Sequence, residues 1–188
     1  MALVASQLAL QARLVDGEDT RKVLIDAYTR VQTIAGVHDH LWRQYAADYI
    51  EICGFLNDLC AKIQETSPAH DLNFKGDRVV VPTDQAVPIG LIANELITNA
   101  LEYAYPKKNR GPIDVRLIAP ECGRVVLEVK DQGVGLPSDF DLFKPTKSLG
   151  VRFITSMLRQ LDAEISVNRL DPGTCFRLSI PYNAPQRA

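Results

Sequence analysis

The sequence predicts an α+β fold: an N-terminal helical hairpin, then an α/β sandwich in which helices cover one face of a mixed sheet. Two observations predict this division. Residues 1–66 contain no proline and carry apolar residues at helical spacing, whereas residues 67–188 alternate helices with pairs of strands joined by tight turns. We therefore expect a helical hairpin and linker helix in 1–66 and a second domain in 67–188.

The composition excludes several classes of protein. A net charge of −2 gives no general reason to expect nucleic-acid binding or attraction to an acidic membrane. No apolar run approaches the roughly 18–20 residues of a membrane span. The four cysteines form no C-x-x-C pair, which argues against a zinc or thioredoxin-like site. Reduced thiols are expected instead, and with them a cytoplasmic location.

The first domain reads as two helices joined by a short break. Apolar residues at helical spacing begin at Leu3, and Asp16-Gly17 interrupts them before a second helix of about 19–42. So short a break predicts an antiparallel hairpin. A third helix is expected over about 46–65. The apolar stripe of the hairpin needs a cover, either a second copy that completes a four-helix bundle or the rest of the same chain.

Elements of the second domain are bounded by turn residues. Helices are expected over about 83–104, headed by Pro82 and Asp84, and over about 149–161. The strands are expected at Leu72–Phe74, Arg78–Val81, and about 113–119, 124–131, 164–169 and 174–181. Strand pairs joined by tight turns favour a mixed or antiparallel sheet with helices on one face.

A polar pair lies in the segment ELITNALEYAYP. Glu95 and Asn99 are four residues apart, so both point the same way from a helix. An amide oxygen suits magnesium, which in proteins usually sits between protein oxygens and phosphates. A pair of polar side chains that simply face solvent is the other interpretation, and this segment does not decide between them.

Three glycine-containing segments could approach a ligand. In DQGVGLP, Asp131 ends a strand before Gly133 and Gly135, and its carboxylate could accept hydrogen bonds from an exocyclic amine such as that of adenine. In KSLGVRFI, Ser148 and Gly150 stand at a helix N-terminus, a geometry that binds phosphate. The third is PGTCF, which opens the last strand. Alone, the first is equally compatible with a plain turn, and each of the other two is more often only a cap or a turn.

The order of these segments resembles the ATPase superfamily of gyrase, heat-shock chaperones, histidine kinases and mismatch-repair proteins. ELITNALEYAYP looks like its N box, DQGVG like its G1 box, SLG like its G2 box and GT like its last glycine box. Within the superfamily, SQLALQAR, IAGVHDHLW and the compact lid LPSDFDLFKPTKSLGV are similar to the HWE / HisKA-2 class of bacterial sensor histidine kinases. This resemblance covers nearly the whole chain.

The resemblance implies a protein-histidine kinase that uses ATP and Mg²⁺. Asn99 would hold magnesium and Glu95 would act as base or polarising group. The phosphoryl group would pass to histidine and then to an aspartate of a response regulator, which docks on the hairpin of a homodimer. The implied ATP-binding residues are Asn99, Tyr103, Asp131, Gly133, Gly135, Ser148, Leu149, Gly150 and Thr174.

The chain departs from that class in several places. The acceptor histidine would fall just before Met1, so the chain is either a fragment or a protein that lost the acceptor; the intact nucleotide motifs favour a fragment. His38 matches a second-helix histidine of the class, while His40 and His70 have no motif around them. Glu102 stands where the family usually has a basic residue, and Asp162 where it commonly has glycine.

Two other functions remain open on these grounds. Glu102 and the missing acceptor would also suit a module that lacks autokinase activity and only binds nucleotide or docks a response regulator. A serine/threonine kinase of the anti-sigma type is the third reading, but proteins of that type lack the helical hairpin.

Overall fold

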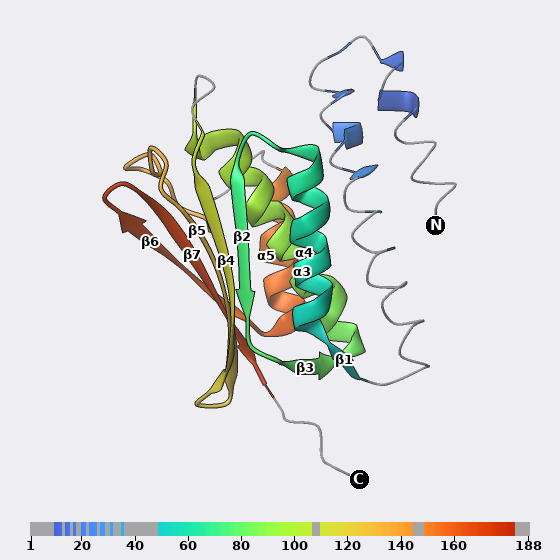
Figure 1. Cartoon of the computed structure of the whole chain (residues 1–188), viewed down its shortest axis with the longest axis vertical. Helices are drawn as coiled ribbons and strands as arrows, with labels where there is room; N and C mark the ends of the chain where they lie inside the picture. The colour runs from blue at the N-terminus through green and yellow to red at the C-terminus, as the bar shows by residue number, and fades with distance from the viewer. Residues whose placement is uncertain are drawn as a thin grey trace.

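The structure is a computed structural model, and it describes residues 49–106, 110–144 and 149–182 together with scattered residues between 10 and 35 (Figure 1). Described residues of the hairpin are helical on both sides of the non-helical Val15 and Gly17, and the N–H of Arg21 bonds the carbonyl oxygen of Gly17 at 2.8 Å. The predicted break between two helices is therefore present. His38, His40 and Ser148 lie outside the described residues.

The centre of the second domain is a five-stranded mixed sheet with the order β2-β4-β5-β7-β6. Strands β2 and β4 pair in parallel, and every other neighbouring pair is antiparallel. The bounds of these strands are β2 Asp71–Gly76, β4 Pro112–Glu121, β5 Arg124–Asp131, β6 Glu164–Leu170 and β7 Gly173–Pro181. The mixed sheet that the turn pattern predicts is confirmed.

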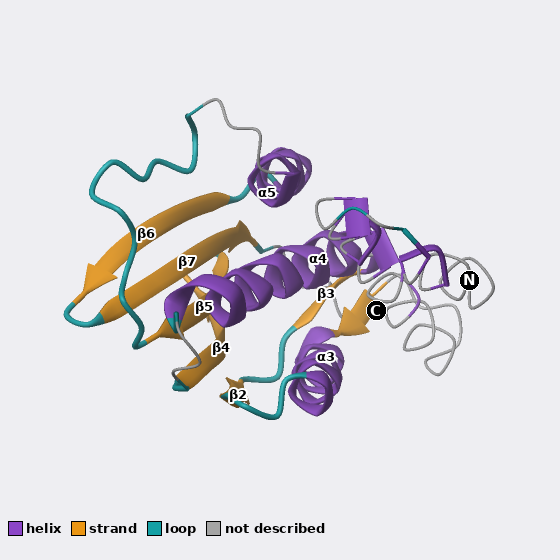
Figure 2. Cartoon of the chain, turned by 90° about the horizontal axis from the view of Figure 1, so that it is seen from above, coloured by secondary structure: helices purple, strands orange, loops and turns teal. Residues whose placement is uncertain are grey.

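Three helices cover one face of this sheet (Figure 2). They are α3 Ile52–Thr66, α4 Thr83–Asn99 and α5 Leu149–Leu161, with α4 between the other two. The expected helix of about 83–104 is divided, because Ala100–Ala104 continue α4 as a π-helix, η1. No helix in the described part of the chain is long and apolar enough to cross a membrane.

The start of the third helix differs from the prediction. Residues Tyr49–Glu51 form a strand, β1, which pairs antiparallel with β3 (Val80–Pro82) in a separate two-stranded sheet. The Glu51 carboxylate then accepts the N–H groups of Cys53 and Gly54 at 2.8 and 3.2 Å, so the helix begins only at Ile52. A side-chain cap of this kind satisfies N–H groups that have no partner within the helix.

Helix α3 belongs to the same hydrophobic core as the sheet. Its buried residues Ile52, Phe55, Leu56 and Leu59 cluster with inward-facing residues of α4 and of the strands. Burial of these apolar side chains supplies most of the driving force that holds a helix on a sheet. The domain division at residue 66 stays a prediction.

Candidate functional site

A cavity of about 540 Å³ opens between the end of α4, the ends of β5 and β7, and the residues that follow β5. We call residues 136–148 the lid; the structure describes 136–144 of them. The cavity has a volume typical of small-molecule sites. It is lined by Leu96, Asn99, Ala100, Tyr103, Ala104, Val129, Asp131, Val134, Gly135, Leu136, Pro137, Phe140, Leu142, Val151, Ile154, Thr174 and Phe176.

Five residues that the motifs single out line this cavity. Asn99 and Tyr103 come from the α4–η1 helix, Asp131 and Gly135 from the end of β5 and its turn, and Thr174 from the start of β7. These segments lie far apart in the sequence. The tertiary structure thus brings the N-box, G1 and last glycine segments to one hollow.

Asp131 is the buried acid of the site. Only 6% of its surface is exposed, and its Oδ1 accepts the backbone N–H of Gly133 at 2.9 Å. Burial raises the pKa of the Asp131 carboxyl above its ordinary value, and hydrogen bonds from the backbone N–H groups of Gly133 and Thr174 offset part of that rise. The result is an oriented acceptor in a largely apolar wall.

Gly133 is required by the close approach of the G1 turn to the helix. A Cβ atom at this position would lie 2.1 Å from the carbonyl oxygen of Ala104, well inside van der Waals contact. The next residue, Val134, donates its N–H to the same oxygen at 2.9 Å. Gly135 has a φ of +74°, a region that costs a side chain steric energy. The two glycines therefore let the turn close against η1.

Gly173 brings the β6–β7 hairpin against Asp131. Its φ is +110°, and a Cβ atom there would lie 2.2 Å from the carbonyl oxygen of Asp131. The following Thr174 is only 2% exposed and lines the cavity beside the acid. Glycine in the PGTCF segment is thus dictated by close backbone packing at the site.

The α4 side of the cavity carries the polar pair that the sequence indicates. Asn99 is half-buried and lines the hollow; Glu95, one turn earlier, is half-buried but is not among the lining residues. Tyr103 is 60% exposed and lies at the rim. The π-helical turn begins directly after Asn99, and such turns occur often at functional sites.

The α5 side presents a helix N-terminus. The helix begins at Leu149, so the backbone of Leu149 and Gly150 forms its first turn, while the predicted cap Ser148 lies outside the described residues. Val151 and Ile154 from the next positions line the cavity. The first N–H groups of a helix lack intrahelical partners and carry partial positive charge, which favours an anion.

The motifs did not indicate the apolar floor of the cavity, which is formed by Val129, Phe140 and Phe176. Val129 and Phe176 lie two residues from Asp131 and Thr174 on neighbouring strands, and Phe140 of the lid meets Phe176 edge to face with ring centroids 6.4 Å apart. Because side chains alternate along a strand, the positions i±2 from each candidate polar residue should share its face. That rule could have identified the two strand residues, but nothing local marks Phe140.

Tyr105 was also missed, and it supports the site from outside the cavity. Its hydroxyl donates to the carbonyl oxygen of Pro112 at 2.6 Å and accepts the N–H of Gln132 at 2.9 Å. Burial raises the pKa of the Tyr105 phenol. A Cβ at Gly111 would lie 2.2 Å from the tyrosine ring, so glycine makes room for it. The ring also contacts His70, with centroids 5.4 Å apart.

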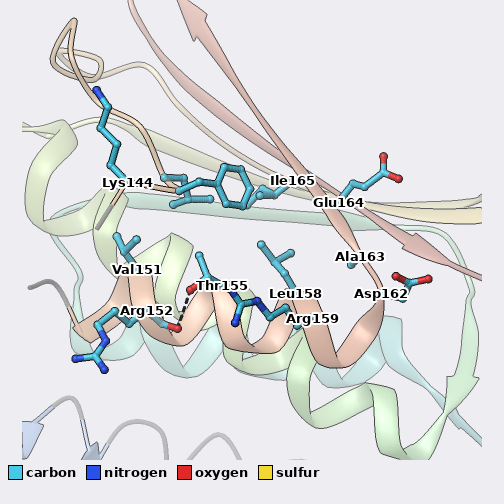
Figure 3. A pocket seen from close by; sticks show the side chains of 12 residues that line it. Lys144, Val151, Arg152, Thr155, Leu158, Arg159, Asp162, Ala163, Glu164 and Ile165 are labelled. Carbon is cyan, nitrogen blue, oxygen red and sulfur yellow. Dashed lines mark hydrogen bonds between the residues drawn. The ribbon is translucent and has the colours of Figure 1, made fainter. Parts of the chain in front are cut away.

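A second cavity, of about 640 Å³, lies between α5, the start of β6 and residues 142–144 of the lid (Figure 3). Val151, Thr155 and Leu158 point from the helix toward Ile165 of β6. Its charged residues are of both signs, namely Lys144, Arg152, Arg159, Asp162 and Glu164. None of the candidate ATP-binding residues lines it. No group of three or more His, Cys, Asp or Glu that could hold a metal ion occurs among the described residues.

Two family models match the chain. The one described as "Histidine kinase-, DNA gyrase B-, and HSP90-like ATPase" matches residues 84–184, and a histidine kinase family, HisKA_2, matches residues 1–67. The first match covers more than half of the sequence, so the chain belongs to this ATPase family, whose members bind ATP. With the second match over the hairpin, it is the ATP-binding catalytic part of a sensor histidine kinase. The predicted resemblance is confirmed.

Curated relatives carry the same kind of region. "Sensor histidine kinase PdtaS" of Mycobacterium tuberculosis is 31% identical over 188 residues, which cover 95% of this chain and 36% of that protein. "Blue-light-activated histidine kinase 2" of Erythrobacter litoralis is 33% identical over 112 residues, which cover 60% of this chain and 32% of that protein. The chain thus spans about a third of the length of the curated relatives it matches.

A solved structure shares the fold over almost the whole chain. The histidine kinase domain of the Erythrobacter litoralis EL346 blue-light activated histidine kinase superposes with a TM-score of 0.76 at 24% identity. The match covers 96% of this chain and 93% of that chain. The predicted α+β architecture, a hairpin followed by a sandwich, is therefore confirmed at the level of fold.

Proposed function

We propose that this chain catalyses Mg²⁺-dependent transfer of the γ-phosphoryl group of ATP to a histidine, from which it passes to an aspartate of a response regulator. The observation that carries the proposal is the convergence of Asp131, Asn99 and Thr174 from three separate elements on one cavity. An acceptor for adenine and an amide suited to a metal–phosphate complex are what such a reaction needs.

The adenine end of the site is assigned to β5 and β7. Asp131 would accept the exocyclic amine of adenine, because its carboxylate is held by Gly133 and faces a cavity with an apolar floor. Gly135 allows close approach of the turn, and Thr174 supplies a polar group beside the acid. Tyr103 at the rim would cover one side of the nucleotide.

The phosphate end is assigned to α4 and α5. The Asn99 amide oxygen would hold Mg²⁺, which usually takes one or two protein oxygens and several from phosphates and water, and which would neutralise charge on the phosphates. One protein oxygen, from Asn99, is in keeping with this coordination. The backbone N–H groups of Ser148, Leu149 and Gly150 would bind phosphate oxygens at the helix N-terminus. Glu95 would orient or deprotonate the attacking imidazole.

The helical hairpin is assigned to dimerisation and regulator docking. Four of its described apolar residues are largely exposed: Leu10, Leu14, Val23 and Ile25 have 56, 66, 47 and 46% of their surface exposed, whereas Ala12 is buried. Apolar surface of this kind is stabilised when a second copy covers it, as in a four-helix bundle. We also place the chain in the cytoplasm, in keeping with its four free cysteines.

A binding experiment tests the nucleotide site. Titration calorimetry with ATP, with and without Mg²⁺, is expected to show metal-dependent binding that Asp131→Asn abolishes and Asn99→Asp alters. Asp58→Asn, at an exposed carboxylate on α3, is the matched control for charge and should bind as the parent does. Absence of ATP binding by the parent chain would refute the proposal.

A labelling experiment tests the transfer. The chain is mixed with γ-labelled ATP, Mg²⁺ and a partner chain of the same class that carries an intact first helix. Acid-labile label on a histidine of the partner is the expected result, and it should vanish in Asn99→Ala. ATP binding without any transfer would leave a binding module as the function.

A second candidate function, a binding module without autokinase activity, is favoured by Glu102. This acid lies three residues after Asn99, and its side chain is exposed in η1. An acid near the phosphates would oppose their negative charge. If the chain is a nucleotide-binding or regulator-docking module without autokinase activity, Glu102→Lys should strengthen ATP binding but still yield no labelled histidine.

A further inference from the structure

One arginine holds the beginning of the lid. The guanidinium of Arg169 donates from Nη1 to the carbonyl oxygen of Leu136 at 2.6 Å, and from Nη2 to those of Pro137 and Ser138 at 2.8 and 3.3 Å. Three consecutive backbone carbonyls thus converge on one side chain. A planar guanidinium with five donors suits such a set, whereas an ammonium cannot match its fork.

These carbonyls belong to a wall of the nucleotide cavity. Leu136 and Pro137 both line it, and they follow Gly135 directly. Proline cannot supply a backbone N–H, so this part of the lid has fewer ways to form a regular hydrogen-bonded structure of its own. The carbonyl oxygen of Pro137 also accepts the N–H of Phe140 at 3.1 Å, so the bonds from Arg169 add to one local turn and tie it to β6.

The arginine is itself anchored on the opposite wall. Arg169 lies near the end of β6 and pairs in register with Thr174 of β7, which lines the cavity. The neighbouring Gly173 approaches the carbonyl oxygen of Asp131 closely. One hairpin thus contacts the acid on one side and holds the lid on the other, so the distance between these two walls depends on Arg169.

Charged residues of the lid lie near the arginine. Asp139 and Asp141 of the lid line a shallow hollow of about 420 Å³ together with Arg169, Ile165 and Val167. The nearby carboxylates favour a cation at this spot, although the exposure of Arg169 makes each such contribution small. The three carbonyl bonds, of which those to Leu136 and Pro137 are the shorter, carry the restraint.

We propose that Arg169 is a positioning residue for nucleotide binding, which acts by holding Leu136–Ser138 so that the lid side of the cavity is formed before ATP arrives. This inference rests on the proposed function, since it concerns the same cavity. Preformed walls raise affinity because binding then orders fewer groups. Arg169 is assigned no contact with the nucleotide.

The test compares three variants of the whole chain. Arg169→Ala removes the fork, Arg169→Lys keeps the charge and can retain only part of the bonding, and Arg116→Ala removes an exposed arginine on the open face of the sheet as the matched control. ATP dissociation constants come from titration calorimetry in Mg²⁺. Hydrogen exchange of lid amides 138–144 and thermal unfolding are measured without nucleotide.

Arg169→Ala is expected to weaken ATP binding about three- to thirtyfold, because it removes hydrogen bonds made by a charged donor. Amide exchange in 138–144 should accelerate, while exchange in the core strands and the unfolding temperature should change little. Arg169→Lys should recover part of the affinity, and Arg116→Ala should match the parent. Affinity equal to the parent in Arg169→Ala, or a loss that follows only a large drop in unfolding temperature, would overturn the inference.

Failure of the proposed function would look different. If the parent chain binds no ATP, the nucleotide site is wrong, whatever Arg169 does. If the parent binds ATP and Arg169→Ala binds equally well with unchanged lid exchange, the site stands and the role of Arg169 is refuted.

Discussion

The carbonyl oxygen of Ala104 accepts the backbone N–H of Val134 at 2.9 Å. This bond joins the last residue of the π-helix to the turn between the two G1 glycines, although thirty positions separate them in the sequence. Asn99 and Asp131 reach the same cavity because their two segments meet at this point. A change that pushes the segments apart should therefore disturb the site and the fold together.

Gly133→Ala is expected to push η1 and the G1 turn apart. The new methyl group would meet the Ala104 carbonyl at 2.1 Å, so the backbone must shift. Such overpacking typically costs about 1–3 kcal/mol. We expect a loss of that size in urea unfolding and a loss of ATP binding in calorimetry.

The matched control is Gly123→Ala in the β4–β5 turn. Gly123 has a φ of +72°, but no atom lies within 4 Å of an added Cβ. Gly123→Ala should lower the free energy of unfolding only by the strain of a left-handed alanine, about 1–2 kcal/mol. ATP binding should be unchanged. Equal ATP affinity in the two variants would contradict the proposed role of the Ala104 contact.

Asp131→Asn is expected to separate stability from binding. Burial raises the pKa of the Asp131 carboxyl in the folded protein. The ordinary aspartate pKa is about 3.9, so at a pH between this value and the raised pKa the carboxyl is ionised in the unfolded chain but still protonated in the folded one. In that window the stability of the parent falls relative to the variant as the pH rises, and above it the difference stays constant.

Urea unfolding of the nucleotide-free proteins over a pH series measures this. The asparagine variant should be at least as stable as the parent at neutral pH, yet it should not bind ATP. The prediction would be wrong if the free energy of unfolding of the parent rose relative to that of the variant as the pH rises, because the fold would then stabilise the ionised carboxylate.

Tyr105→Phe should weaken the support of the G1 turn. The change removes the hydroxyl that bonds both the Pro112 carbonyl and the Gln132 N–H. The partly buried Pro112 carbonyl then loses its partner, whereas the exposed Gln132 N–H can bond water, so the change should cost about 1 kcal/mol in urea unfolding. Tyr49→Phe, on β1, is the control and should unfold like the parent. Equal midpoints for the two variants would count against the bridging role.

The cysteines should differ sharply in reactivity. Burial raises the pKa of the Cys60 thiol to about 12, and its side chain is 4% exposed. Only about one thiol in ten thousand would be ionised at pH 8, and the thiolate is the reactive form. Cys122 is exposed in the β4–β5 turn. Mass spectrometry after brief alkylation should find Cys122 modified and Cys60 intact until urea unfolds the chain; early modification of Cys60 would contradict its burial.

Much of the fold could be predicted from local patterns. The strand Arg124–Asp131 and the helix Leu149–Leu161 have the expected bounds, because alternation and helical periodicity are strong there. Prediction erred at Tyr49–Glu51, where an apolar stretch next to a helix forms a strand with β3. That pairing joins segments about thirty residues apart, and no local pattern records it.

The site was predictable in part. The motifs indicated Asn99, Asp131 and Thr174, and all three line one cavity; their roles toward nucleotide and metal stay predictions. Arg169 had no such signal, since an arginine near the end of an edge strand is ordinary for a solvated surface. Only the path of the lid brings three carbonyl groups to it.

The sequence by itself determined the family, the order of the elements and the glycines at which the backbone must turn or approach closely. Those properties depend on local sterics, periodicity and residue chemistry, which act within a few positions. The tertiary structure decided that the end of η1 meets the G1 turn, that β1 pairs with β3, and that Arg169 holds the lid. These contacts depend on how distant segments pack around one hydrophobic core, a property of the whole chain.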